Sequence, residues 1–185
     1  KIDMPYGLKK IDSQVFYDCD ALNNVSIPDS VTSIGSQAFY GCDTLSDVQF
    51  GIGVKEIPDS AFRKCPSLVE ITLPRYCTKV ASNAFAENTK MTKVTVFPSM
   101  TSIENNSFSY PAKMTMRGVS GSYAETYANN RKMTFEAINN PITGLNFYKD
   151  SLDFATTWET KVLPLSIAPS DGTGDITYTS ADENI

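Results

Sequence analysis

The sequence predicts a solenoid, a fold in which short structural units stack along one axis. Two sets of apolar residues carry this prediction, because each set returns at intervals of 23 residues. The aliphatic column consists of Ile11, Ile34, Ile57, Val80 and Ile103. The phenylalanine column consists of Phe16, Phe39, Phe62, Phe85 and Phe108. One unit of this length cannot bury its apolar face alone, so neighbouring units must stack on one another.

Three further apolar columns predict one short strand in each unit. A leucine is followed three positions later by an apolar residue and two positions after that by another, as in Leu45, Val48 and Phe50. Side chains two residues apart on a strand share one face. This order is typical of the strand of a leucine-rich repeat, so each unit is expected to add one strand to a parallel sheet.

A helical turn is expected after each residue of the aliphatic column. The position two residues later always carries a side chain that is favoured at a helix N-cap, where it accepts a bond from a backbone amide of the first turn. These residues are Ser13, Ser36, Asp59, Ser82 and Asn105. The phenylalanine that follows is then expected to point inward.

The two ends of the repeat region differ. Residues 2–8 repeat the apolar pattern of residues 25–31, so the chain opens inside a repeat and further repeats are expected upstream. The other end carries a predicted cap. Residues 114–116 are expected to form a strand, residues 121–128 a short amphipathic helix with Ser120 or Ser122 as N-cap, and residues 133–137 a closing strand.

A second domain is expected to begin at the turn-rich joint Asn139-Asn140-Pro141. The first domain then spans residues 1–138 and the second spans residues 139–185. Apolar residues alternate beyond the joint, which predicts the short strands of an all-β sandwich. Such sandwiches usually need roughly 80–100 residues. The second domain is therefore expected to be incomplete in this sequence.

Composition argues against several classes of function. The net charge of −5 and the pI near 4.7 disfavour binding to nucleic acid and to anionic membrane surfaces. The chain has no histidine, which removes Ser-His-Asp and Cys-His catalytic sites and the usual zinc centres. The remaining carboxylate pairs, such as Asp18 with Asp20, are interpreted as turn acids and helix caps. No enzymatic activity, cofactor or metal is expected.

The four cysteines are interpreted mainly as buried free thiols. Cys19, Cys42 and Cys65 share one column, in which Asn88 takes the fourth place, and Cys77 lies in another column. Stacked side chains run parallel to one another, which suits disulfide geometry poorly, although a disulfide and a metal site both remain open.

The units resemble the BspA-like leucine-rich repeats, a group of bacterial surface proteins. The segments Ile34–Leu45 and Ile57–Leu68 carry the resemblance, and Gly121–Ala128 is similar to the usual terminal segment of that family. Asn88 departs from the pattern because it stands in place of a cysteine. Residues 139–185 resemble the start of a bacterial immunoglobulin-like domain through segments such as Pro141–Leu145.

The resemblance implies a secreted or cell-surface bacterial protein that takes part in adhesion. Family members of this kind bind host matrix proteins or other cells, and the resemblance carries no catalytic residues with it. The expected location is therefore extracellular or on the bacterial cell surface. The expected partner is a protein, with no nucleic acid and no membrane insertion of this segment.

The expected binding surface is the outer face of the predicted sheet. Its outward residues are polar and of mixed charge: Asn24, Ser26, Asp47, Gln49, Glu70, Thr72, Lys93 and Thr95. One alternative is a structural spacer, in which this face is merely solvated. Another is a carbohydrate-binding module, which is disfavoured because only Tyr17 and Tyr40 share an exposed aromatic column.

Overall fold

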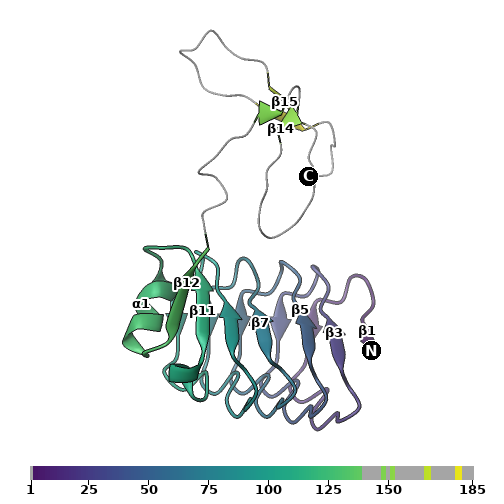
Figure 1. The fold of residues 1–185 in the computed structure, drawn as a ribbon. Helices are drawn as coiled ribbons and strands as arrows, with labels where there is room; N and C mark the ends of the chain where they lie inside the picture. The colour runs from purple at the N-terminus through teal and green to yellow at the C-terminus, as the bar shows by residue number, and fades with distance from the viewer. Residues whose placement is uncertain (1, 139–146, 149–150, 153–164, 168–177, 181–185) are drawn as a thin grey trace. The chain divides into compact units, whose positions relative to one another are not determined.

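A computed structural model describes residues 2–138 together with 147–148, 151–152, 165–167 and 178–180. The chain divides into two compact units, Lys1–Ile138 and Asn139–Ile185. The first unit is a parallel β-solenoid of about six turns with 23-residue repeats (Figure 1).

Each coil contributes a strand to the principal sheet surface, here called the sheet face, and most coils contribute a second, two-residue strand to a side row. The strands of the sheet face are β1 (Ile2–Asp3), β3 (Asn24–Ser26), β5 (Asp47–Gln49), β7 (Glu70–Thr72), β9 (Lys93–Thr95), β11 (Thr115–Gly118) and β12 (Thr134–Ala137). The strands of the side row are β2 (Lys10–Ile11), β4 (Ser33–Ile34), β6 (Glu56–Ile57), β8 (Lys79–Val80) and β10 (Ser102–Ile103). The strand pairs of both rows are parallel, and equivalent residues pair, as Val25 does with Val48.

Two interruptions divide these rows. The hydrogen-bonded ladder stops between β5 and β7 on the sheet face and between β4 and β6 in the side row. In the side row, Gly35, Ala81 and Glu104 each donate a backbone N–H to the preceding coil. Pro58 occupies the equivalent position and has no N–H to donate, which explains the second interruption.

The phenylalanine column forms the spine of the core. Phe39, Phe62 and Phe85 are fully or almost fully buried, Phe108 is buried, and Phe16 is half-buried at the first coil. Successive rings stack with centroids 5.0 to 5.5 Å apart and planes within 16° of parallel. The aliphatic column is buried as well, so the prediction that both columns line up inside a stack is confirmed.

The prediction of a helical turn after each residue of the aliphatic column is wrong. The described segments after the aliphatic column contain no helix and form two successive turns instead. In the coil of Phe39, the Ala38 and Tyr40 amides close these turns, whereas the Phe39 and Gly41 amides donate to carbonyls of the next coil. The residues that open the turn adopt a left-handed backbone, as at Gln37 with φ of 58°. A helix would have used these amides within one segment and broken the bonds between coils.

The cap agrees with the prediction in its elements. A short 3₁₀ helix (η1, Pro111–Lys113) precedes β11, and α1 (Tyr123–Asn130) lies between β11 and β12 (Figure 1). Ser122 occupies the N-cap position without a side-chain cap bond, and Glu125 accepts a bond from the Gly121 amide at 2.7 Å. The Tyr123 hydroxyl accepts the Ile103 N–H at 3.0 Å, so the helix satisfies an amide of the last side-row strand.

The second unit contributes two antiparallel strand pairs to the described residues. Strand β13 (Phe147–Tyr148) pairs with β14 (Ser151–Leu152), and β15 (Leu165–Ile167) pairs with β16 (Tyr178–Ser180). The predicted immunoglobulin-like sandwich as a whole lies outside the described residues.

Candidate interaction surface

The eight residues predicted for the binding surface lie in two rows across the sheet face. One row is Asn24, Asp47, Glu70 and Lys93, and the other is Ser26, Gln49, Thr72 and Thr95, with equivalent residues of paired strands opposite each other. Six of the eight are exposed, and Lys93 is half-buried.

The prediction that Thr95 belongs to the binding surface is wrong, because this residue is only 6% exposed. It pairs in register with Thr72 on one side and with Arg117 on the other. The small threonine side chain thus lies next to a long one, and it offers almost no surface to a partner.

The sequence prediction missed two charged residues of the same face. Arg117 continues the row of Thr95 on β11, and Glu136 pairs with it on β12, with Arg117 Nε 3.1 Å from Glu136 Oε1. The last coils are shorter than 23 residues, so a strict period does not reach these positions. The signal that could have found Arg117 is strand spacing, since it follows Thr115 by two residues.

Charge is unevenly distributed on the sheet face. Asp47 and Glu70 lie on neighbouring coils on either side of the ladder interruption. Glu70 faces Lys93, whose Nζ is 3.7 Å from Glu70 Oε2, and Asp47 accepts a bond from Gln49 Nε2 at 3.4 Å. The face therefore presents an acidic region beside a region of paired charges.

A second polar surface follows the phenylalanine column on the outside of the turns. The rings of Tyr17 and Tyr40 stack with centroids 4.8 Å apart and planes 6° from parallel. Arg63 and Lys64 lie over the Tyr40 ring, with Lys64 Nζ 5.5 Å from its centroid. A hydrogen bond with the Tyr40 hydroxyl raises the pKa of Lys64. Arg63 also forms an ion pair with Glu87.

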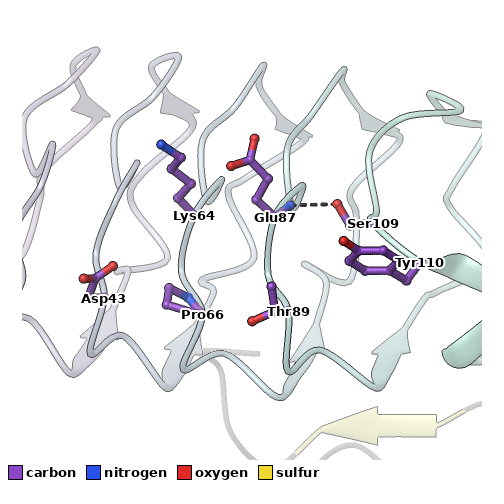
Figure 2. A pocket seen from close by; sticks show the side chains of 7 residues that line it. All are labelled: Asp43, Lys64, Pro66, Glu87, Thr89, Ser109 and Tyr110. Carbon is purple, nitrogen blue, oxygen red and sulfur yellow. Dashed lines mark hydrogen bonds between the residues drawn. The ribbon is translucent and has the colours of Figure 1, made fainter.

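A shallow, open hollow of about 530 Å³ continues this surface toward the cap (Figure 2). It is lined by Asp43, Lys64, Pro66, Glu87, Thr89, Ser109 and Tyr110. The Glu87 amide donates to Ser109 Oγ at 2.8 Å. The lining is mixed in charge and open to water.

The cysteine column makes hydrogen bonds that explain its composition. The Cys42 and Cys65 thiols donate to the carbonyls of Phe16 and Phe39 at 3.1 and 3.2 Å. Asn88 continues the pattern, because its Nδ2 donates to the Phe62 carbonyl at 3.0 Å. Its Oδ1 also accepts the Cys65 amide at 2.8 Å. The column thus requires a small donor beneath the phenylalanine carbonyl.

All four cysteines are free, as predicted, and three of them are buried. Cys19 differs from the prediction because it is only half-buried at the first coil. Burial raises the pKa of Cys77 to about 11. Within the described part of the chain, no three His, Cys, Asp or Glu residues gather in a way that could hold a metal ion. That part also contains no helix with the length and apolar character needed to cross a membrane.

Comparison with solved structures gives related solenoids. A leucine-rich cell surface protein from Faecalibacterium prausnitzii A2-165 is 32% identical, with a TM-score of 0.62 over 73% of this chain and 35% of that chain. The T. pallidum leucine-rich repeat protein TpLRR is also 32% identical, with a TM-score of 0.57 over 60% of this chain and 52% of that chain. A leucine-rich repeat protein from Bacteroides ovatus shares the fold at 24% identity and a TM-score of 0.57, over 73% of this chain and 41% of that chain.

This chain therefore spans about a third to a half of the length of these relatives. A search among curated proteins gives no match. The model of the BspA type leucine-rich repeat region matches residues 1–115 with six copies of the repeat. Repeat spacing, buried columns and this match lead to one assignment: the chain belongs to the BspA-type leucine-rich repeat family.

Proposed function

We propose that the solenoid is a non-catalytic interaction module that binds a protein partner through the sheet face. The observation that carries the proposal is the contrast between a buried, repeated spine and an outer face whose polar residues change from coil to coil. The seven strands of the sheet face form a ribbon roughly 30 Å long at about 4.8 Å per coil.

The proposal also covers the location of the protein and its biological role. The BspA-type family and the surface-protein relative from F. prausnitzii support a location outside the cell or on the bacterial cell surface. A protein in that position meets host matrix proteins and the surfaces of other cells, so adhesion is the proposed role. The second unit, with its antiparallel strand pairs, is proposed to be an immunoglobulin-like spacer that links the solenoid to its neighbours.

A binding experiment tests the proposal. The full chain is assayed by biolayer interferometry against purified extracellular-matrix proteins and by attachment to cultured cells. A variant that carries Asp47→Ala, Gln49→Ala, Glu70→Ala and Thr72→Ala is assayed beside it. All four side chains are exposed, so the fold is expected to survive. Binding by the wild type and its loss in this variant support the proposal.

The spacer alternative predicts a different result, in which the same variant attaches to cells as well as the wild type. The carbohydrate alternative is supported by the stacked Tyr17 and Tyr40 rings and by the polar hollow next to them. It predicts binding on a glycan array that Tyr17→Ala with Tyr40→Ala abolishes. The first result would contradict the proposed protein-binding role of the sheet face, and the second would assign a carbohydrate site to the two tyrosines.

A further inference from the structure

A further exposed surface, separate from the sheet face and from the tyrosine surface, lies where the chain leaves β5 and β7. It is formed by the turns that lead to β6 and β8 (Figure 1). Its centre is apolar, since Ile52 is 53% exposed and Tyr76 is 47% exposed. Lys55 and Arg75 flank the tyrosine, with Lys55 Nζ 4.6 Å and Arg75 Cζ 6.0 Å from the ring centroid. We call these four residues the corner patch.

The turns that carry the corner patch are held by neighbouring coils. The Ile52 amide donates to Asp29 Oδ1 at 2.9 Å, and Ser99 Oγ donates to the Arg75 carbonyl at 2.6 Å. Gly53 packs so closely that a Cβ there would lie 2.4 Å from the Asp29 carbonyl oxygen. A surface fixed in this way loses little conformational entropy when a partner binds.

The cations of the corner patch are not neutralised within the described part of the chain. Neither Lys55 nor Arg75 forms an ion pair there. Lys55 Nζ is 3.5 Å from the Ile52 carbonyl oxygen, which places the ammonium beside the exposed apolar side chain. The Asp29 carboxylate is engaged otherwise, because its Oδ1 accepts the Ile52 amide.

The patch thus combines an exposed aliphatic group, an exposed aromatic ring and two unpaired cations. Aromatic and arginine side chains are enriched at the centres of protein interfaces. Carboxylates are the complementary groups for the two cations. An aliphatic side chain such as Ile52 offers nothing to the hydroxyls of a polysaccharide, whereas it packs well against an apolar side chain.

We propose that the corner patch is a binding site for an acidic peptide segment of a partner protein, in which an apolar side chain is flanked by carboxylates. The apolar side chain rests on Ile52 and Tyr76, and the carboxylates meet Lys55 and Arg75. This site is separate from the sheet-face residues proposed above, and it does not depend on that proposal.

Selection from a phage-displayed random peptide library tests the site. The full chain is the target, and a variant with Ile52→Ser and Tyr76→Ser is the counter-target. The enriched peptides are expected to carry carboxylates next to a large apolar residue. Their affinity for the full chain, measured by fluorescence anisotropy, is expected to fall as salt is added.

Variants then assign the contacts. Lys55→Glu with Arg75→Glu, and separately Ile52→Ser with Tyr76→Ser, should each weaken binding of the enriched peptides by about tenfold or more. Lys64→Glu with Lys90→Glu reverses two exposed cations outside the patch and should leave the affinity for the enriched peptides unchanged. The sheet-face variant should also leave it unchanged. Circular dichroism melts confirm that each variant is folded.

Three outcomes would overturn the proposal. Enriched peptides without carboxylates would contradict the charge argument. Equal binding by the charge-reversed variant would exclude Lys55 and Arg75 as contacts. If the full chain selects no peptide but binds heparin, and only the charge-reversed variant loses heparin, the patch is a polyanion site and the peptide assignment is wrong.

Discussion

The interior and the exterior of the solenoid repeat to different degrees. In the interior, five coils place phenylalanine at the same position, and the rings stack within 5.5 Å of one another. On the sheet face, Asn24, Asp47, Glu70 and Lys93 occupy one row with four different side chains. Close packing between identical coils requires nearly identical groups, whereas a solvated face imposes no such limit. This difference between interior and sheet face indicates that the repeated interior determines the fold, whereas the variable exterior is available for recognition.

Removal of an interior ring should have the largest effect. Phe62→Ala is expected to lower the free energy of unfolding by about 3–5 kcal/mol, because Phe62 is fully buried between two stacked rings and contacts Phe50 edge-on. Urea denaturation followed by circular dichroism measures the loss. Phe16→Ala is the matched control, and it should cost less because Phe16 is half-buried. Equal losses of unfolding free energy in the two variants would contradict the role assigned to burial of the ring.

Asn88→Ala should have an effect similar to or smaller than that of Phe62→Ala, because each of the two buried groups that it leaves unpaired costs about 1–3 kcal/mol. The substitution removes the partner of the Cys65 amide and the donor to the Phe62 carbonyl. Asn88→Cys should cost less, because a thiol in this column donates to the phenylalanine carbonyl, as Cys65 does. Urea denaturation of both variants checks the order, and a cysteine variant no more stable than the alanine variant would refute the role assigned to the column.

Alkaline pH should destabilise the interior through Cys77. Burial raises the pKa of this thiol from 9.0 to about 11, so the folded state holds its proton more tightly than the unfolded state. Its contribution to stability is fully present below pH 9.0 and is lost as the pH rises to about 11. The melting temperature of the wild type should fall more across this range than that of Cys77→Ala. Parallel pH profiles of the two proteins would show that this thiol is not responsible.

An exterior ion pair should have the smallest effect. Lys93 and Glu70 are partly exposed, and a pair of this kind contributes about 0–1 kcal/mol. A double-mutant cycle with Glu70→Ala and Lys93→Ala measures the coupling by urea denaturation. A coupling energy close to the loss in Phe62→Ala would abolish the distinction between interior and exterior.

The interior was predictable from the sequence because packing repeats with the coils. The 23-residue period of Ile11 and Phe16 places the buried columns of the regular coils, and it also places the outward residues from Asn24 to Lys93. The period fails at β11 and β12, where the coils shorten, and so Arg117 and Glu136 were not predicted. Thr95 pairs with Arg117 of β11, which lies beyond the regular period, so the period alone did not indicate that Thr95 is buried.

The turns were not predictable in the same way. Ser36 and its equivalents match the preference for helix N-caps, but the backbone amides that follow bond to the next coil. Local propensity cannot reveal a hydrogen-bond partner 22 residues away, such as Ala61 for the Phe39 amide. The left-handed column of Gln37 contains no glycine, and in the left-handed column of Lys64 only Gly41 signals the conformation.

One paired measurement tests the division between interior and exterior most directly. Unfolding by urea and attachment to cultured cells are determined for the wild type and the four-residue sheet-face variant defined above. We expect the variant to unfold within about 0.5 kcal/mol of the wild type for each exposed substitution and to lose attachment. A variant that unfolds as the wild type does and still attaches fully would contradict the assignment of recognition to the sheet face.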